Sequence, residues 1–450
     1  AVGNVANLTL PTPGSGNSLG DNKDIIIDSI SPRIINVNST KPDGFYGIGV
    51  SINITVTFNE TVYVIGTPQL SLETGSADGW AYYIGGDGTD TLIFNYTVAL
   101  GHDSTDLNYN SSVALILNGG TIMDGVGRDA ILTLPILRGA GSLFANRDIM
   151  IDGLPPSGTI SINDGAFWTN SVDVVLNFSA YDTISGVDEV RFRNANGSWT
   201  SWEPAYPTPR SWSLPSIDGN YTVIYQIRDY ALNWIELNDT IGLDVTLPSG
   251  SILINSSADT NNFWTTSISV SLILSFNDTG PDVDAISGVF LVRYRNEDGT
   301  WSPWEDANTT KAWPLSEGDG WSKIVYYQIE DKAGNIAQFN DTINLDTTAP
   351  IIIGNLPIGY YWSGQPVISV SVFDLTLDDI WYEVGSYTRS MSNNTEILLD
   401  NVIWNSLDNG EFIIYIRAGD DWGHICDAYV ITLYKDTLAP SLAVSSPGNN

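Results

Sequence analysis

Residues 185–203 read SGVDEVRFRNANGSWTSWE and residues 287–305 read SGVFLVRYRNEDGTWSPWE, so one pattern returns at an offset of 102 residues. The same offset pairs residues 225–229 (YQIRD) with 327–331 (YQIED). Upstream, residues 167–169 and 263–265 (both FWT) match at an offset of 96, which places six additional residues in the second copy, near residues 281–284. A repeat of this length is the size of one β-sandwich domain, so these are two copies of one domain.

A third, weaker copy follows the first two. It opens at residues 361–363 (YWS), and residues 419–423 (GDDWG) stand where the second copy has residues 330–334 (EDKAG). It closes at residues 436–440 (DTLAP), as the second copy closes at residues 346–350 (DTTAP). The chain is therefore expected to hold a third domain of the same type.

The N-terminal region carries a different repeat. Residues 1–32 match residues 125–156 without a gap, with 15 of 32 positions identical. Residues 1–28 are therefore expected to be the tail of a preceding repeat, with strand-like pieces at 6–10 and 24–27. The expected organisation is 1–28, tail strands of a preceding repeat; 29–152, a first domain type; 153–246, 247–348 and 349–437, three copies of a second type, the last divergent; and 438–450, the start of a further domain.

Within each unit the hydrophobic pattern is that of β-strands. Residues 51–58 (SINITVTF), 172–178 (VDVVLNF) and 267–272 (SISVSL) alternate polar and apolar with period two. Gly, Asn, Asp and Pro clusters separate the runs, and no segment shows sustained helical periodicity. We expect an all-β chain of tandem immunoglobulin-like β-sandwich domains in a rod-like array.

Composition excludes several classes of partner. The formal net charge is −34, with 18 Lys and Arg against 52 Asp and Glu, so nucleic acid is not an expected partner. A single cysteine, Cys426, excludes a disulfide framework, and a buried inert thiol is the expected state. No apolar run is long enough for a membrane span in this stretch, and no signal peptide is present. Surplus carboxylates serve solubility or bind Ca²⁺, and the composition leaves both open.

The repeats resemble known families. Residues 29–152 resemble an immunoglobulin- or cadherin-like repeat of large bacterial and archaeal surface proteins, on stretches such as 36–75, 88–109, 114–135 and 140–153. Residues 153–440 resemble a second type of prokaryotic Ig-like domain, on residues 331–335 (DKAGN) and the closing 346–350 (DTTAP). The first copy reads DYALN at 229–233 and lacks the glycine, which weakens a shared role for this loop. The resemblance implies an extracellular, cell-surface setting, but fold alone does not fix function.

Glycosylation sequons are about twice as frequent as chance predicts from the composition. This excess predicts N-linked glycans on a secreted protein, although Asn and Thr are also favoured at strand ends and turns. Asn53 lies in mid-strand, where a solvent-facing position can carry a glycan. The candidate N-glycosylation sites are Asn7, Asn38, Asn53, Asn59, Asn95, Asn110, Asn177, Asn196, Asn220, Asn238, Asn255, Asn277, Asn308, Asn340 and Asn393.

Aspartates recur at the expected domain boundaries and in one loop of each unit. In a sandwich, the closing strand and the loops near the next domain can converge, so oxygen ligands there could hold Ca²⁺ and stiffen the linker. The alternative is that each boundary Asp caps a turn before a proline. The candidate ligands are Asp28, Asp152, Asp244, Asp346 and Asp436 at the boundaries, and Asp124, Asp229, Asp331 and Asp420 in the loops.

Tryptophans and histidines complete the candidates. Trp199 with Trp202, and Trp301 with Trp304, are spaced by three; they are expected to pack over a hairpin as part of the core, the alternative being a sugar-stacking site. The only two histidines lie in different predicted domains, and neither has a nucleophile elbow or zinc spacing around it. We therefore expect no enzymatic activity in this stretch.

Together these features predict a glycosylated structural repeat protein of the cell surface: a surface-layer (S-layer), sheath, stalk or filament component. We expect self-association with identical subunits or neighbouring repeats, for example through sheet edges. Two alternatives stay open, namely an adhesin that binds glycans or a partner cell, and the non-catalytic accessory region of a large secreted enzyme.

Overall fold

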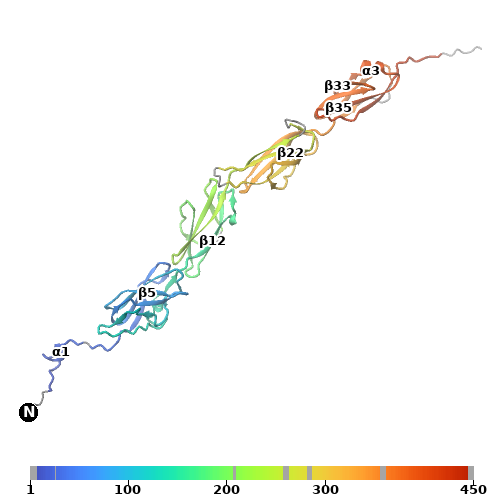
Figure 1. The fold of residues 1–450 in the computed structure, drawn as a ribbon. Helices are drawn as coiled ribbons and strands as arrows, with labels where there is room; N and C mark the ends of the chain where they lie inside the picture. The colour runs from blue at the N-terminus through green and yellow to red at the C-terminus, as the bar shows by residue number, and fades with distance from the viewer. Residues whose placement is uncertain are drawn as a thin grey trace, which may run out of the picture. The chain divides into compact units, whose positions relative to one another are not determined.

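The computed structural model describes residues 8–25, 27–205, 209–256, 263–280, 286–354 and 361–443. Its strands form four successive β-sandwich domains, which hold β1–β11, β12–β19, β20–β27 and β28–β36 (Figure 1). The expected all-β class and tandem immunoglobulin-like organisation are confirmed.

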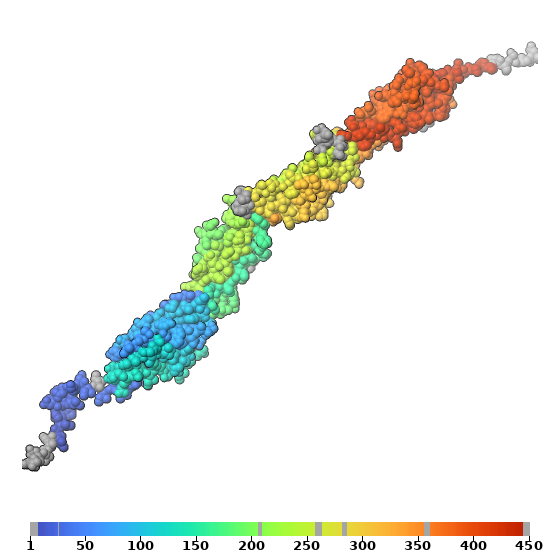
Figure 2. All heavy atoms as spheres, viewed as in Figure 1, coloured from blue at the N-terminus to red at the C-terminus, as the bar shows by residue number. Residues whose placement is uncertain are grey.

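The first domain pairs an eight-stranded sheet, of order β1-β3-β6-β5-β4-β8 with β10 on β3 and β9 on β4, with a small sheet of order β2-β11-β7. Its elements are β1 (Ile34–Ser39), β2 (Gly44–Tyr46), β3 (Ser51–Ile65), β4 (Gln69–Glu73), β5 (Gly79–Gly85), β6 (Thr89–Thr97), β7 (Asp103–Ser104), β8 (Asn108–Tyr109), β9 (Leu115–Ile116), β10 (Thr121–Met123), α2 (Leu143–Asn146) and β11 (Ile149–Asp152). The alternation expected over 51–58 is the first half of β3, and it buries every second side chain. Segments far apart in the sequence share one packed body (Figure 2).

The second and third domains share one topology. Each has a three-stranded sheet, β12-β14-β17 or β20-β22-β25, and a five-stranded sheet, β13-β19-β18-β15-β16 or β21-β27-β26-β23-β24. The second domain consists of β12 (Ser157–Ile162), η1 (Asn163–Gly165), β13 (Trp168–Thr169), β14 (Asp173–Tyr181), β15 (Val187–Asn194), β16 (Glu203–Pro204), β17 (Arg210–Ser213), β18 (Gly219–Asp229) and β19 (Trp234–Leu243). The third consists of β20 (Ser249–Asn255), β21 (Trp264–Thr265), β22 (Ser269–Asn277), β23 (Val289–Asn296), β24 (Glu305–Asp306), β25 (Thr310–Pro314), β26 (Gly320–Asp331) and β27 (Ile336–Leu345).

The fourth domain keeps the five-stranded order, as β29-β36-β35-β32-β33, beside two two-stranded sheets, β28-β31 and β30-β34. Its elements are β28 (Ile351–Gly354), β29 (Tyr361–Trp362), β30 (Val367–Ile368), β31 (Val370–Phe373), β32 (Leu377–Val384), β33 (Tyr387–Met391), β34 (Ile397–Leu398), α3 (Asn401–Ser406), β35 (Gly410–Asp420) and β36 (Tyr429–Lys435). Helix α3, capped by Asp400, was not expected from the sequence. Cys426 is buried and free, as expected.

A register irregularity recurs at one place in the last three domains. It falls between Val187 and Glu189 in β15, and between Val289 and Leu291 in β23. In β32 it falls between Leu377 and Asp379. Each irregular strand starts opposite the loop Asp that ends its partner strand, namely Asp229, Asp331 and Asp420. A shared bulge at this position sets the same geometry beside each loop.

The N-terminal segment does not form the expected strands in its described residues. Residues 8–10, 24, 25 and 27 lie outside any strand, and the short helix α1 (Leu19–Asn22) is present instead. This helix matches α2 at the repeat offset, and each begins at a serine, Ser18 or Ser142, whose hydroxyl accepts a backbone N–H. Strands β2 and β7 pair with β11 in the first domain, and residues 24, 25 and 27 have no such pairing among the described residues. The serine-capped helix therefore forms in both repeats because it depends on local contacts, whereas a strand forms only where neighbouring strands pair with it.

Candidate functional site

Four clusters of acidic side chains bring the predicted residues together. Each joins an Asp that closes one domain, or precedes the first domain, to side chains of the domain that follows, which come from loops and strand ends except for Glu60, inside β3. In each cluster, one ligand atom of every member lies within 4.8 Å of the others. The first cluster is Asp28, Glu60 and Asp124; the second is Asp152, Asp182 and Asp229; the third is Asp244, Asp278 and Asp331; and the fourth is Asp346, Asp420 and His424.

The second and third clusters share a hydrogen-bonded frame. Asn233 donates from Nδ2 to the Asp152 carbonyl oxygen at 2.9 Å and to Asp229 Oδ2 at 2.9 Å. In the third cluster, Asn335 donates in the same way to the Asp244 carbonyl and to Asp331, each at 2.8 Å. One asparagine therefore fastens the loop of each domain to the closing strand of the domain before it.

The loop keeps its shape without its glycine. Asp229 Oδ1 accepts the Asn233 N–H at 2.8 Å, just as Asp331 Oδ1 accepts the Asn335 N–H at 2.8 Å. Leu232 takes φ = 68° where Gly334 has φ = 93°. The sequence suggested that losing this glycine weakens a shared role for the loop. The loop geometry is nonetheless the same, because Leu232 adopts the left-handed conformation and bears its steric cost.

The third cluster is the most buried. The exposed fractions of Asp244, Asp278 and Asp331 are 2%, 9% and 1%. Asp278 Oδ2 accepts the Gly288 N–H at 2.7 Å, but Asp278 Oδ1 is buried and has no hydrogen-bond partner among the described residues. A buried carboxylate oxygen without a partner is costly, and a bound cation would satisfy it.

The first cluster is more open. Asp124 is 4% exposed, and its Oδ1 accepts the N–H groups of Val126 and Arg128, each at 2.8 Å. Its Oδ2 has no partner among the described residues. The guanidinium of Arg128 donates to the Asp28 carbonyl oxygen. The pKa of Glu60 is raised, through desolvation and then through the charges of Asp28 and Asp124.

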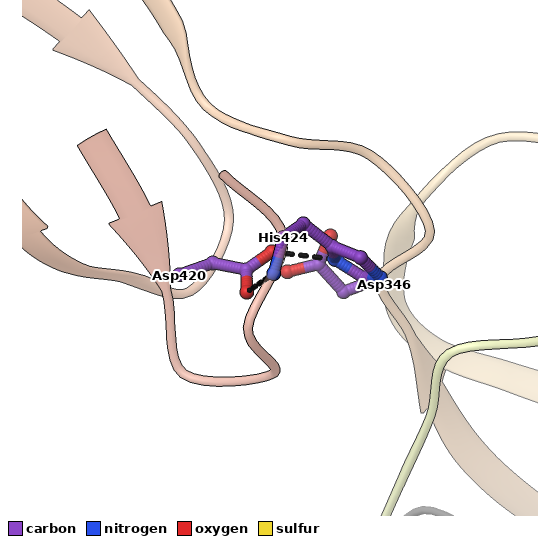
Figure 3. Close-up of side chains that lie close together, drawn as sticks. All are labelled: Asp346, Asp420 and His424. Carbon is purple, nitrogen blue, oxygen red and sulfur yellow. Dashed lines mark hydrogen bonds and ion pairs between the residues drawn. The ribbon is translucent and has the colours of Figure 1, made fainter. Parts of the chain in front are cut away.

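In the fourth cluster a histidine takes the place of the asparagine (Figure 3). His424 N donates to Asp420 Oδ1 at 2.9 Å, and its ring Nδ1 lies 2.6 Å from Asp420 Oδ2. Asp346 is fully buried: Oδ2 accepts the Thr376 hydroxyl at 2.5 Å, and Oδ1 has no hydrogen-bond partner among the described residues.

Burial and mutual repulsion raise the pKa of several carboxyls in and beside these clusters. Desolvation, with the charges of Asp152 and Asp182, raises the pKa of Asp229 to about 6, against the hydrogen bonds from Asn233. Desolvation is also the main cause of the raised pKa of the following acids: Asp278, Asp331, Asp346 and Asp374. Like charges at 4.8 Å repel by roughly 3.5 kcal/mol per pair at an effective dielectric constant of about 20. A divalent cation removes this repulsion.

Most of the predicted acidic residues belong to one of the clusters. It brings eight of them together in the four clusters, but Asp436 is exposed, with Oδ1 accepting the Leu438 N–H, and joins no cluster among the described residues. Four members of the clusters were not predicted from the sequence, namely Glu60, Asp182, Asp278 and His424. A signal for two of these existed, because Asp-Thr and then Ile-Ser-Gly-Val occur in both copies, separated by the six-residue insertion.

The candidate glycosylation sites fall into two structural groups. One group is exposed: Asn59, Asn196, Asn220, Asn238, Asn255, Asn277, Asn308 and Asn340. In the other, the side-chain amide donates inside the fold: Asn95, Asn110, Asn177 and Asn393. Asn38 and Asn53 are half-buried, with Oδ1 accepting hydrogen bonds, and Asn7 lies outside the described residues.

The paired tryptophans stack against arginine guanidinium groups. Trp202 lies between Arg228 at 4.5 Å and Arg191 at 4.2 Å, each measured to the ring centroid. Trp199 lies between Arg191 at 4.6 Å and Arg193 at 4.8 Å. In the third domain, Arg293 and Arg295 cover the corresponding pair. The tryptophans are half-buried and stack on guanidinium groups, rather than packing into the apolar core as expected.

Comparisons with known proteins identify no family for this chain. No family model matches, and no curated protein matches. Solved structures that match include a tetra-tandem repeat from the extending region of a large adhesion protein, with 13% identity over 90% of this chain and 100% of that one, at a TM-score of 0.29. Protocadherin Gamma B2 cadherin domains 3–6 match with 10% identity over 89% of this chain and 99% of that one, at a TM-score of 0.27. Sidekick-1 immunoglobulin domains 1–5 match with 9% identity over 91% of this chain and 99% of that one, at a TM-score of 0.25.

In the part of the chain that the structure describes, no helix has the length and apolar character needed to cross a membrane.

Proposed function

We propose that this chain is a non-catalytic structural region of an extracellular surface protein, whose domain junctions are fixed by Ca²⁺. The observation that carries the proposal is the recurrence of buried acidic clusters where one domain meets the next. Turn capping alone would account for single aspartates, but not for loop acids gathered against each closing aspartate.

The oxygen-only clusters suit Ca²⁺. Ca²⁺ takes six to eight oxygen ligands from carboxylates, carbonyls and water, and tolerates irregular geometry. The buried oxygens without partners, Asp124 Oδ2 and Asp278 Oδ1, lie in two of these clusters. Bound Ca²⁺ would hold each loop to the preceding strand more firmly than the asparagine hydrogen bonds alone.

The surface features support an extracellular setting. Exposed sequon asparagines and the strongly acidic composition suit a glycosylated, soluble surface protein. An adhesin that uses the paired tryptophans for sugar stacking is less favoured, because arginines lie against these rings. We also propose that identical subunits associate into a layer, sheath, stalk or filament.

Calcium binding tests the junction proposal directly. Isothermal titration of the metal-free chain is expected to show Ca²⁺ binding at the oxygen-only clusters, and small-angle scattering is expected to show a narrower range of domain arrangements with Ca²⁺ than with EGTA. Unchanged stability and scattering on chelation would contradict it. Immunogold electron microscopy of the native cell tests the setting: label in a regular lattice or fibre supports the structural role, and isolated stalks favour an adhesin.

A further inference from the structure

The fourth cluster differs from the others by one residue. His424 stands at the fifth position of its loop, where Asn233 and Asn335 stand in the equivalent loops. All three residues donate a backbone N–H to the first Asp of the loop, at 2.8, 2.8 and 2.9 Å. The backbone frame is therefore the same, and an imidazole replaces an amide beside a buried carboxylate pair.

The exchange removes a donor from the domain junction. Asn233 and Asn335 each donate to the carbonyl of the closing Asp, whereas the ring of His424 is engaged with Asp420 Oδ2 through Nδ1. His424 Nε2 has no hydrogen-bond partner among the described residues. An imidazole nitrogen thus lies directly beside a carboxylate oxygen, and the neutral ring can bind a metal there in place of the hydrogen bond.

A second observation at this place points to a ligand. Asp346 is fully buried, yet its Oδ1 has no hydrogen-bond partner in the described residues. In Figure 3 the Asp346 carboxylate faces Asp420 and His424. The oxygen is therefore desolvated without compensation, beside another carboxylate and an imidazole, and a cation at this point would satisfy it.

We propose that the fourth cluster binds a divalent metal of the Zn²⁺ class through the His424 imidazole and the carboxylates of Asp346 and Asp420, whereas the other clusters do not. Ca²⁺ prefers oxygen ligands, whereas imidazole suits Zn²⁺, Co²⁺ and Ni²⁺. Three protein ligands leave a further position for water. Asp374 lies near this cluster, and its pKa is raised by desolvation and then by the charges of Asp346 and Asp420. This goes beyond the proposed Ca²⁺ junctions and depends on different residues.

The test uses the complete, tag-free chain with Zn²⁺ and Co²⁺ as probes. Titration is expected to give one Zn²⁺ site, and X-ray absorption of the Zn²⁺- or Co²⁺-loaded chain is expected to show nitrogen in the coordination sphere. The variant His424→Asn, which installs the residue of the equivalent loops, should weaken Zn²⁺ binding by about tenfold or more, since even loss of a group that only orients a ligand costs ten- to a hundredfold. His102→Gln, which changes the only other histidine, should leave it unchanged.

The reverse substitution gives a second measurement. Asn335→His should create an additional Zn²⁺ site in the third cluster, where three carboxylates are already present. Equal Zn²⁺ affinity of the wild-type and His424→Asn chains, absence of Zn²⁺ binding, or an all-oxygen coordination sphere would overturn the proposal. Ca²⁺ titration of the same samples separates the two proposals, because His424→Asn is expected to leave Ca²⁺ binding at the oxygen-only clusters intact.

Discussion

Substitution of Asp278 by Asn is expected to change stability in opposite directions with and without Ca²⁺. Asp278 faces Asp244 and Asp331 with ligand atoms no more than 4.8 Å apart, and at that upper limit two unit charges repel by roughly 3.5 kcal/mol at an effective dielectric constant of about 20. The raised pKa of Asp278 and Asp331 lets the cluster reduce its charge by taking up protons. The net gain in the metal-free variant is therefore smaller, on the order of 1–3 kcal/mol.

The hydrogen bonds of Asp278 survive this substitution. The asparagine carbonyl oxygen can still accept from Gly288 N, which now donates to Asp278 Oδ2 at 2.7 Å, and the new amide fills the place of the oxygen that has no partner. With Ca²⁺ the sign reverses, because the wild-type chain gains about 2.7 kcal/mol at a hundredfold excess over the dissociation constant, and the variant has lost a charged ligand.

Hydrogen exchange of peptides from β26 is the suitable assay, because a chain of several domains does not unfold in one two-state step. Exchange is compared in EGTA and in excess CaCl₂, with Asp306→Asn, an exposed acid of the same domain, as the matched control. The reasoning is refuted if Asp278→Asn destabilises the third domain in EGTA as well. That result would mean that the cluster is an ordinary hydrogen-bonded turn.

Four further outcomes are expected. Arg191→Ala should destabilise the second domain by about 1–2 kcal/mol in chemical denaturation, because the guanidinium stacks on both Trp199 and Trp202. Leu232→Gly should stabilise it by about 0.5–1 kcal/mol, since glycine adopts the positive φ without steric cost. Desolvation raises the pKa of Asp106 to about 6 from 3.8, so the folded first domain binds this proton more tightly than the unfolded chain does. The thermal midpoint of the first domain should therefore fall as pH rises from about 4 to 6. Asp106→Asn should reduce this dependence of the thermal midpoint on pH. Glycopeptide mass spectrometry of the native protein should find glycans on the exposed sites Asn196, Asn238, Asn255, Asn277, Asn308 and Asn340, and an unmodified Asn393, whose amide donates to Val372.

Most of the correct predictions from the sequence depended on its internal repeats. Their period predicts sandwich domains, and the recurrence of Asp at domain ends and in one loop predicts that the two sets converge. Asp152 with Asp229, and Asp244 with Asp331, meet as this reasoning requires. Alternation predicts β3, because every second side chain of a half-buried strand enters the core.

Other features depend on contacts that no local pattern shows. Asp278 was hidden because a six-residue insertion separates it from the Ser-Gly pair that it shares with Asp182. The stacked tryptophans of the second domain need arginines from two neighbouring strands, β15 and β18, whose register is set only on folding. The strands expected near residues 6–10 and 24–27 need pairing partners, whereas helix α1 needs only its own serine cap and forms without them.

In the equivalent loops of the last three domains, different residues determine the backbone shape and the side-chain contacts. Backbone shape is fixed by the first Asp and by a residue with positive φ, which is Leu232, Gly334 or Gly423. The side chain of the next residue makes the contact across the junction in two of the loops, through Asn233 and Asn335. The third loop has His424 at this position and keeps the same backbone hydrogen bond. An amide there fastens two domains by hydrogen bonds, and an imidazole offers a nitrogen ligand instead. If the metal preference of a junction follows this single position, exchanging Asn335 and His424 should exchange the Zn²⁺ affinity of the two clusters while leaving both sandwiches folded.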